Sequence, residues 1–191
     1  MQLTIKLTGQ RPMLHHNGRL ANPTDPYTRE LKALTSKRKK TDEDLILIMQ
    51  AESRGSCWET EDGRLGIPNG AVWRCIFDSA TAFRLGKVIK AALNFEDITV
   101  PLLSNGREWL CDEYIRQPGA IDYRPVRVQT ARTMRARTRV TNWSSIHQFE
   151  LLEDVLDPRD LAPVLERAGR LVGLGDWRPT YGTFVPEVVK A

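Results

Sequence analysis

Apolar and polar residues alternate at the start of the chain. Leu3, Ile5 and Leu7 are separated by polar residues, a period of two that puts apolar side chains on one face of a β-strand. We therefore predict that residues 2–8 form the first strand of the core. The following stretch, 10–67, is polar and is interrupted by prolines and glycines, which indicates an insertion on the domain.

The clearest helix is predicted at residues 67–86. Pro68 and Asn69 are expected to start it and Gly86 to end it. Its apolar side chains recur on one helical face, and they are Val72, Ile76, Ala80 and Phe83.

Strand patterns dominate the middle of the chain. Residues 96–103 are apolar and β-like, although Pro101 moves this strand towards an edge or a bulge. Residues 104–122 are expected to be a loop, and 126–140 to be a long two-stranded ribbon with a bend in its middle. The density of β-forming residues in 144–153 predicts a further strand.

The last third of the chain predicts a helix and a closing strand. Apolar residues repeat at helical spacing from Leu161 to Val172. If Asp157 were the cap, Pro163 would lie beyond the first turn and would remove a hydrogen bond. We therefore predict that Asp160 caps this helix. Residues 181–189 form the closing strand in this prediction.

The predicted core elements follow the order strand, helix, strand, strand, helix, strand. This order predicts an α+β fold with a ferredoxin-like, RRM-like βαββαβ core, in which two helices cover one face of a four-stranded antiparallel sheet. The whole chain, 1–191, is expected to be one domain with two insertions. One is a helical basic insertion at 10–67, and the other is an arginine-rich ribbon insertion at 104–143.

The helical insertion has its own local signals. A short helix is expected near 27–35, and Thr41 followed three residues later by Asp44 predicts a capping box at the start of a second helix. Between these helices lies a basic run, Lys37, Arg38, Lys39 and Lys40.

Composition excludes several classes of protein. Cys57, Cys75 and Cys111 are odd in number and contain no CxxC pair, so we expect reduced thiols and neither a disulfide framework nor a zinc site. The sequence shows no apolar run of signal-peptide or membrane-spanning length. A soluble, cytoplasmic protein without metal or other cofactor is expected.

Positive charge is concentrated in the arginine-rich segment. The formal net charge is only +4, but residues 123–149 contain no acidic residue and six arginines. Arginine binds phosphate through two parallel hydrogen bonds and stacks on bases, so this segment is suited to nucleic acid. The alternative is an exposed edge that prevents sheet aggregation. We expect exposed phosphate contacts from Arg127, Arg132, Arg135, Arg137 and Arg139.

The basic run at 37–40 has two interpretations. It extends the phosphate-binding track in the first of them. Because Asp42, Glu43 and Asp44 follow it at once, it is also consistent with a solvated turn.

A glycine-rich stretch, GRLVGLGDWRPTYGTF, lies at residues 169–184. Phosphate-binding loops place their glycines before a helix, whereas these follow a helix and precede a strand. A dinucleotide or Walker site is therefore not expected. Gly173 or Gly175 is predicted to cap the helix, and the same loop to contact nucleic acid through Trp177, which stacks on a base, and Arg178, which reaches a phosphate.

These features together resemble the RAMP superfamily. The shared features are a first strand that runs into a polar insertion, the segment Ile67-Pro68-x-Gly70 before the first core helix, and the glycine-rich loop before the last strand. Within that superfamily the chain looks like the backbone subunits of CRISPR effector complexes. It is still more similar to an uncharacterised phage-encoded RAMP-like group that ends in GLGDWRP followed by a tyrosine and a glycine.

The resemblance implies a modified RNA-recognition fold whose glycine-rich loop and insertions grip single-stranded RNA, often in a head-to-tail filament. The location implied for a phage protein is the cytoplasm of the bacterial host. The Asp176-Trp177-Arg178 sequence is unusual for the backbone subunits, which leaves the identity of the ligand open.

Catalysis is the weaker prediction. His15 and His16 follow the first strand, where RAMP-type ribonucleases often carry a histidine for metal-independent cleavage. The sequence shows no partner acid, so His15 is assigned to nucleic-acid contact. Four carboxylates are expected on a helix surface, namely Asp42, Glu43, Asp44 and Glu52. They lack the paired geometry and the nearby His or Cys ligands that a metal site needs.

We therefore predict a non-catalytic binder of single-stranded nucleic acid, RNA slightly preferred over DNA, that self-associates along the strand. Two alternatives remain open at this point. One is a phage protein that mimics or interferes with a host nucleoprotein complex, and the other is a metal-independent ribonuclease.

Overall fold

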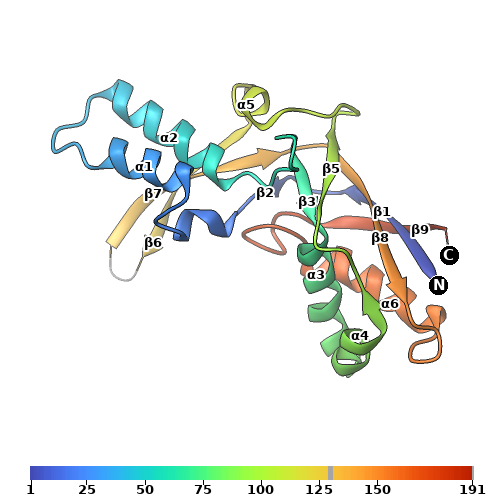
Figure 1. Ribbon diagram of the computed structural model, residues 1–191. Coiled ribbons are helices and arrows are strands. Elements are labelled where there is room, and N and C mark those ends of the chain that lie inside the picture. The colour runs from blue at the N-terminus through green and yellow to red at the C-terminus, as the bar shows by residue number, and fades with distance from the viewer. Residues whose placement is uncertain (129–130, 191) are drawn as a thin grey trace.

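The computed structural model describes residues 1–128 and 131–190, and in it the chain forms two lobes (Figure 1). The larger lobe contains an antiparallel sheet with the strand order β3-β5-β8-β1-β9, and β4 adds a short pairing to β8. These strands are β1 (Gln2–Gly9), β3 (Gly66–Pro68), β4 (Leu93–Asn94), β5 (Thr99–Ser104), β8 (Trp143–Leu151) and β9 (Phe184–Lys190). The fold is α+β with antiparallel sheets, as predicted.

Helices cover one face of this sheet. They are α3 (Asn69–Thr81), α4 (Gly86–Ala92) and α6 (Pro158–Arg167), which continues into a π-helical turn at Ala168–Val172. The alternating side chains Leu3, Ile5 and Leu7 are buried with these helices in one apolar core, so the first predicted strand is confirmed. On β8, Phe149 is buried but Ile146 is 54% exposed, because residues three apart in a strand point to opposite faces.

The smaller lobe contains the arginine ribbon, which we define as β6 (Ile121–Val128) and β7 (Ala131–Val140). These strands pair antiparallel, and β2 (Met13–Leu14) pairs with the inner end of β7. The predicted two-stranded ribbon is therefore confirmed. The residues between the two strands, 129–130, lie outside those that the structure describes, so the predicted bend stays a prediction.

Helices α1 (Pro26–Thr35) and α2 (Asp42–Ser56), which we call the helical hairpin, lie beside the arginine ribbon. The side chains of Glu52 and Ser56 accept hydrogen bonds from the backbone amides of Ala136 and Thr138 at 2.8 and 2.9 Å. Four helical residues rise about 6 Å and two strand residues about 7 Å, so the two spacings match. In this way α2 covers the open edge of β7, which limits unwanted strand pairing.

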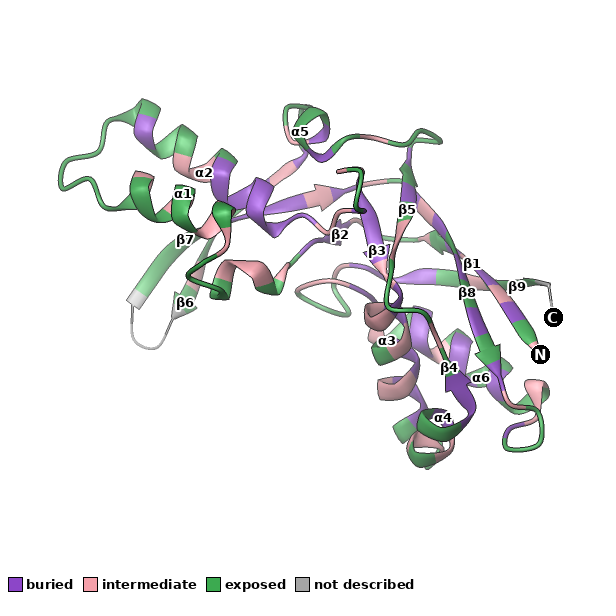
Figure 2. Ribbon diagram, viewed as in Figure 1, coloured by how far each residue is buried: buried purple, intermediate pink, exposed green. Residues whose placement is uncertain are grey.

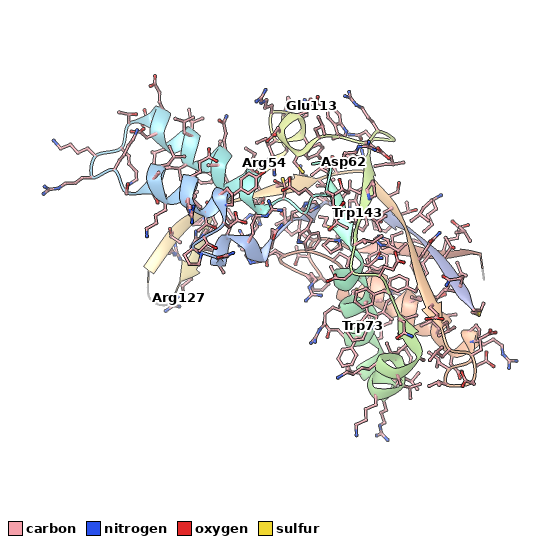
Figure 3. All side chains as sticks on the ribbon, viewed as in Figure 1. Arg54, Asp62, Trp73, Glu113, Arg127 and Trp143 are labelled. Carbon is pink, nitrogen blue, oxygen red and sulfur yellow. The ribbon has the colours of Figure 1, made fainter. Side chains whose placement is uncertain are left out.

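Within the helical hairpin, burial is concentrated in the inner half of α2 (Figure 2). Helix α1 has no buried residue, and the buried residues of α2 lie mainly from Ala51 to Ser56. The hairpin therefore has little core of its own, and polar contacts attach it to the larger lobe. Arg54, at the junction of the lobes in Figure 3, pairs with Glu59 at 2.7 Å and Asp112 at 2.5 Å.

The predicted capping box at the start of α2 is confirmed. The amide of Asp44 donates to the Thr41 hydroxyl, and the amide of Thr41 donates to the Asp44 carboxylate. We expect Thr41→Ala to lower the free energy of unfolding by about 1 kcal/mol. Urea denaturation measures this loss. Thr35→Ala, at an exposed hydroxyl near the end of α1, is the control and should change it by less than about 0.5 kcal/mol; an equal loss would contradict the cap.

Two helix boundaries differ from the prediction. Helix α3 ends at Thr81, so Phe83 lies beyond it and is exposed, and Gly86 begins α4 instead of ending α3. Helix α4 and the single turn α5 (Cys111–Tyr114) were not predicted. Both are short, and periodicity is a weak signal over one or two turns.

The prediction that Asp160 caps α6 is wrong. The cap is Asp157, whose carboxylate accepts from the amide of Arg159, and Pro158 occupies the first helical position. Pro163 therefore lies inside the helix. The helix tolerates it because Pro163 and Arg159 lie on the exposed face, where water can reach the carbonyl that lacks an amide partner.

Cys57, Cys75 and Cys111 are free and buried, in agreement with the predicted reduced thiols. Across the described ranges, the helices are too short and too polar for any of them to cross a membrane.

Candidate nucleic-acid interface

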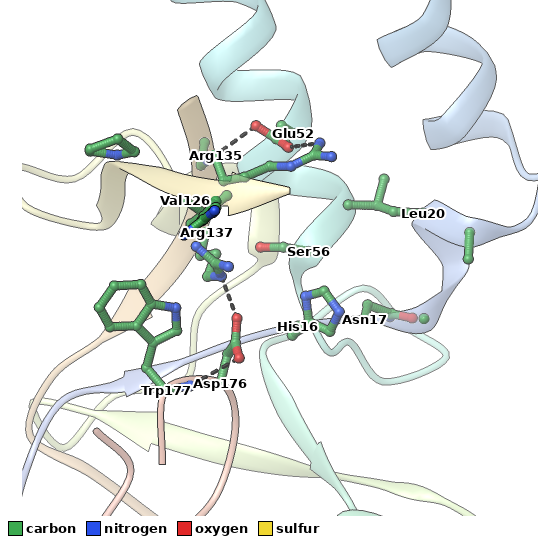
Figure 4. A pocket seen from close by; sticks show the side chains of 15 residues that line it. His16, Asn17, Leu20, Glu52, Ser56, Val126, Arg135, Arg137, Asp176 and Trp177 are labelled. Carbon is green, nitrogen blue, oxygen red and sulfur yellow. Dashed lines mark hydrogen bonds and ion pairs between the residues drawn. The ribbon is translucent and has the colours of Figure 1, made fainter. Parts of the chain in front are cut away.

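A cleft of about 660 Å³ lies where the helical hairpin, the arginine ribbon and the loop before β9 meet (Figure 4). We call the loop before β9, residues 173–183, the glycine loop. The cleft wall includes Glu52 and Ser56 from α2, Arg135 and Arg137 from β7, and Asp176 and Trp177 from the glycine loop. It therefore brings together segments that are far apart in the sequence.

The predicted arginines do not form one continuous track. Because strand side chains alternate between faces, Arg132 lies on the opposite face of β7 from Arg135, Arg137 and Arg139. Arg139 donates to the carbonyl of Gly119 at 3.3 Å. Arg127, Arg135 and Arg137 line the cleft.

Several arginines at the cleft are paired with carboxylates. Arg135 is 2.7 Å from Glu52, and Arg137 is 2.6 Å from Asp176. Arg137 is only 9% exposed, which corrects the expectation that the arginines of this segment are all exposed contacts. The cleft is therefore close to charge balance, and it is not the uncompensated cationic trough that the sequence predicts.

One buried donor is left over in this arrangement. Arg137 donates to Asp176 through Nε, but its Nη1 is buried without a hydrogen-bond partner among the residues that the structure describes. A buried, charged donor without an acceptor costs about 1–3 kcal/mol or more.

Backbone conformation and close packing explain why glycine is needed at three positions of the glycine loop. Gly173, Gly175 and Gly182 all have positive φ, between 72° and 78°. A Cβ on Gly175 would lie 2.3 Å from the Leu14 carbonyl oxygen. Gly173 caps the preceding helix, as the structural interpretation predicts. Gly175 therefore positions the loop on β2, and Gly173 packs against Tyr181 and Gly182 within the loop. We assign neither glycine a phosphate contact.

Trp177 is displayed at the cleft by this loop. It has a φ of 57° and is 42% exposed. The guanidinium of Arg124 lies 4.7 Å from the Trp177 ring centre and 5.0 Å from that of Tyr181. Hydrogen bonds to the Asp122 carboxylate and the Tyr181 hydroxyl raise the pKa of Arg124 above its usual range. The indole is thus held against a permanent cation.

Arg178 points elsewhere. Its Nη1 donates to the Gly173 carbonyl at 3.5 Å and lies 3.9 Å from the Asp78 carboxylate of α3. The sequence predicts that Arg178 and Trp177 contact the same nucleotide. The structure instead directs Arg178 towards α3 and Trp177 towards the cleft.

The two adjacent histidines have different environments. His15 is completely buried, and its Nδ1 accepts a hydrogen bond from the amide of Trp58 at 3.0 Å. Burial lowers the pKa of His15 to about 3. We therefore remove His15 from the predicted interface, since it has no access to a bound strand. His16 is exposed and lines the cleft.

The basic run lies at the outer end of the helical hairpin (Figure 1). The cleft is lined by Glu52 and Ser56, at the inner end of α2. Lys37 pairs with Asp44 at 2.6 Å, and Lys40 donates to the Lys37 carbonyl at 2.9 Å. Arg38 and Lys39 are exposed. This placement favours the solvated-turn interpretation for Lys37, Arg38, Lys39 and Lys40.

The sequence reasoning missed the carboxylates of the cleft. Glu52 was expected on an exposed helix surface, but it is only 5% exposed. A usable signal was the small polar sequence around it, because Ser53 and Ser56 allow α2 to approach β7 closely through hydrogen bonds. For Asp176, the only sequence signal of a place in the cleft was its position next to Trp177.

No protein-family model matches the chain, and a comparison with curated proteins gave no match. Over residues 1–128 and 131–190, no group of three His, Cys, Asp or Glu side chains is placed to hold a metal ion. The functional argument therefore depends on the cleft.

Proposed function

We propose that the chain binds single-stranded nucleic acid, RNA in preference to DNA, in the cleft between the arginine ribbon and the glycine loop. The observation that carries this proposal is that Trp177 and the guanidinium-bearing residues Arg135 and Arg137 line one cleft. An aromatic face binds a base, and a guanidinium binds a phosphate or a base edge.

The carboxylates in the cleft are compatible with this function. A guanidinium has five N–H donors, and an ion pair to one carboxylate uses only part of them. The Arg135 side chain is 48% exposed although it is paired with Glu52. Such pairs hold the guanidinium plane in place, so the ligand does not meet a freely rotating side chain.

The strand order supports a finer proposal about the fold. The order β5-β8-β1-β9, with α3 and α6 in the crossovers, is that expected of a ferredoxin-like sheet built from two split βαβ units. We therefore propose an RRM-like, RAMP-type core to which the helical hairpin and the arginine ribbon are added. Self-association along the bound strand is part of this proposal.

Fluorescence anisotropy with a labelled oligouridylate of about 12 nucleotides tests the binding. We expect the affinity to fall by about tenfold between about 50 and about 200 mM salt, because each neutralised phosphate releases counterions. Arg135→Ala should weaken binding by about tenfold, the value of one desolvated charge contact. The absence of binding at low salt would contradict the proposal.

Arg159→Ala is the matched control, since it removes the same charge from the exposed start of α6. It should leave the affinity within about twofold. An equal loss in both variants would indicate a diffuse charge effect and would remove the cleft from the interface. Cleavage that is lost in His16→Ala would replace non-catalytic binding by the ribonuclease alternative.

A further inference from the structure

We propose that the cleft selects a guanine base from the bound strand. This inference rests on the proposed binding function and adds a base preference to it. The cleft combines fixed carboxylate acceptors, guanidinium donors and an aromatic face, and guanine is the base whose two hydrogen-bonding edges match the first two.

The acceptors are the carboxylates of Glu52 and Asp176. Glu52 is fixed by Arg135 at 2.7 Å and by the amide of Ala136 at 2.8 Å. Asp176 is fixed by the amide of Trp177 at 2.9 Å and by Arg137 at 2.6 Å. Because a carboxylate has about four lone-pair positions, each retains acceptor capacity towards the cleft.

Guanine presents adjacent N1–H and N2–H donors to such a carboxylate. Adenine and cytosine place a ring-nitrogen acceptor beside their amino group, and uracil places carbonyl oxygens on both sides of its N–H. Each of these acceptors would face the negative carboxylate at close range. The carboxylates therefore disfavour the other three bases as well as attracting guanine.

The donors are Arg137 and Arg135. The unpartnered Nη1 of Arg137 is buried in the cleft wall. Guanine O6 and N7 are both acceptors, and arginine is their commonest specific partner. Arg135, whose side chain is 48% exposed at the cleft, keeps N–H donors beyond its pair with Glu52 and can reach these acceptors.

Trp177 supplies the stacking surface. The indole lines the cleft (Figure 4). It is held against the guanidinium of Arg124. A bicyclic purine covers more of an indole than a pyrimidine does, and base stacking on an aromatic side chain is a large share of such binding. The cleft volume of about 660 Å³ lies within the range of small-molecule sites.

Oligouridylates that carry one central guanosine, inosine or adenosine test the inference by anisotropy. We expect guanosine to raise the affinity by about tenfold over adenosine, the discrimination of one good bidentate contact. Inosine lacks the N2 amino group and should lose most of that gain. Equal affinities for the guanosine and adenosine oligomers, with binding intact, would overturn the base preference alone.

Three variants locate the effect. Trp177→Ala should lower the affinity for the guanosine oligomer by about tenfold. Tyr123→Ala is its matched control, because Tyr123 is 41% exposed and lies on the other face of the arginine ribbon from Arg124; it should have no effect. Asp176→Asn should abolish the preference for guanosine while binding of the plain oligouridylate persists, and an unchanged preference would overturn the assignment.

Two further outcomes separate this inference from the proposed function. If guanosine monophosphate binds but no oligonucleotide does at low salt, strand binding is wrong and the guanine site stands. If neither binds, both are overturned. Thermal unfolding of each variant confirms that it has folded before its affinity is interpreted.

Discussion

Replacing Gly182 by alanine is expected to lower the free energy of unfolding by about 3–5 kcal/mol, from a strained backbone and a steric clash together. Gly182 has a φ of 72°, and its added Cβ would lie 1.8 Å from the carbonyl oxygen of Leu174. Neither atom is at the end of a flexible side chain. The Leu174 amide also donates to the Gly182 carbonyl at 2.9 Å, so the two segments cannot separate without losing this bond.

Gly106→Ala separates the two causes. Gly106 has a φ of 75°, but a Cβ there would meet no atom within 4 Å. This variant should lose only the backbone term, about 1–2 kcal/mol. Urea denaturation of both variants measures the difference. Equal losses would show that the close packing of the glycine loop is not rigid.

The same substitution connects stability to the cleft. Gly182 closes the glycine loop that carries Asp176 and Trp177 at the cleft wall. A shift of the loop would move both side chains relative to the arginine ribbon. Gly182→Ala protein that still folds should therefore bind oligonucleotide more weakly than Gly106→Ala protein, because site geometry tolerates displacements of only about 0.5 Å.

Local periodicity predicted most of the elements for a physical reason. A strand or helix with one buried face repeats apolar residues at its own period, so one segment is sufficient to recognise it. Leu3, Ile5 and Leu7 are buried as their alternation indicated. The cap of α6 was missed because Asp157 and Asp160 both suit a helix start, and local rules do not include the solvent exposure that makes Pro163 tolerable.

The charge pattern of the cleft was not predictable in the same way. Arg135 and Glu52 are 83 residues apart, and Arg137 and Asp176 are 39 apart. Acid-free sequence around the arginines suggested free cations, but folding brought carboxylates from α2 and the glycine loop to them. The sequence predicted that the arginine ribbon and Trp177 act together, and residues of both line one cleft. Only the three-dimensional arrangement shows that carboxylates lie among the arginines there.

Acidification from about pH 7 to about pH 5 is expected to lower the free energy of unfolding by about 4 kcal/mol through two buried histidines. Burial lowers the pKa of His15 to about 3 and the pKa of His147 to about 4, from 6.5. Between these values and 6.5 the unfolded chain binds more protons than the folded chain. Stability therefore falls as the pH drops below 6.5, by about 2 kcal/mol for each histidine at about pH 5.

The hydrogen bonds of both rings are consistent with the neutral form, and that of His15 requires it. Asn69 donates through its amide nitrogen to the Glu96 carbonyl, so its oxygen accepts from Nδ1 of His147 at 2.7 Å. Nε2 of the neutral His147 ring then accepts from the Ser145 hydroxyl at 2.9 Å. His15 likewise accepts through Nδ1, from the amide of Trp58. The pKa of Asp157 is held at about 2 by Arg159, so that carboxylate loses its contribution only below about pH 4, outside this range.

Urea denaturation at the two pH values measures the effect, and the three histidines provide internal controls. His147→Gln should lose only about half as much stability on acidification, because one of the two buried titrating groups is gone. His16→Gln should lose as much as the unchanged protein, since His16 is exposed. An unchanged free energy of unfolding from neutral to mildly acid pH would mean that the His15 and His147 sites admit water or a counter-charge, and it would contradict the burial of these two rings.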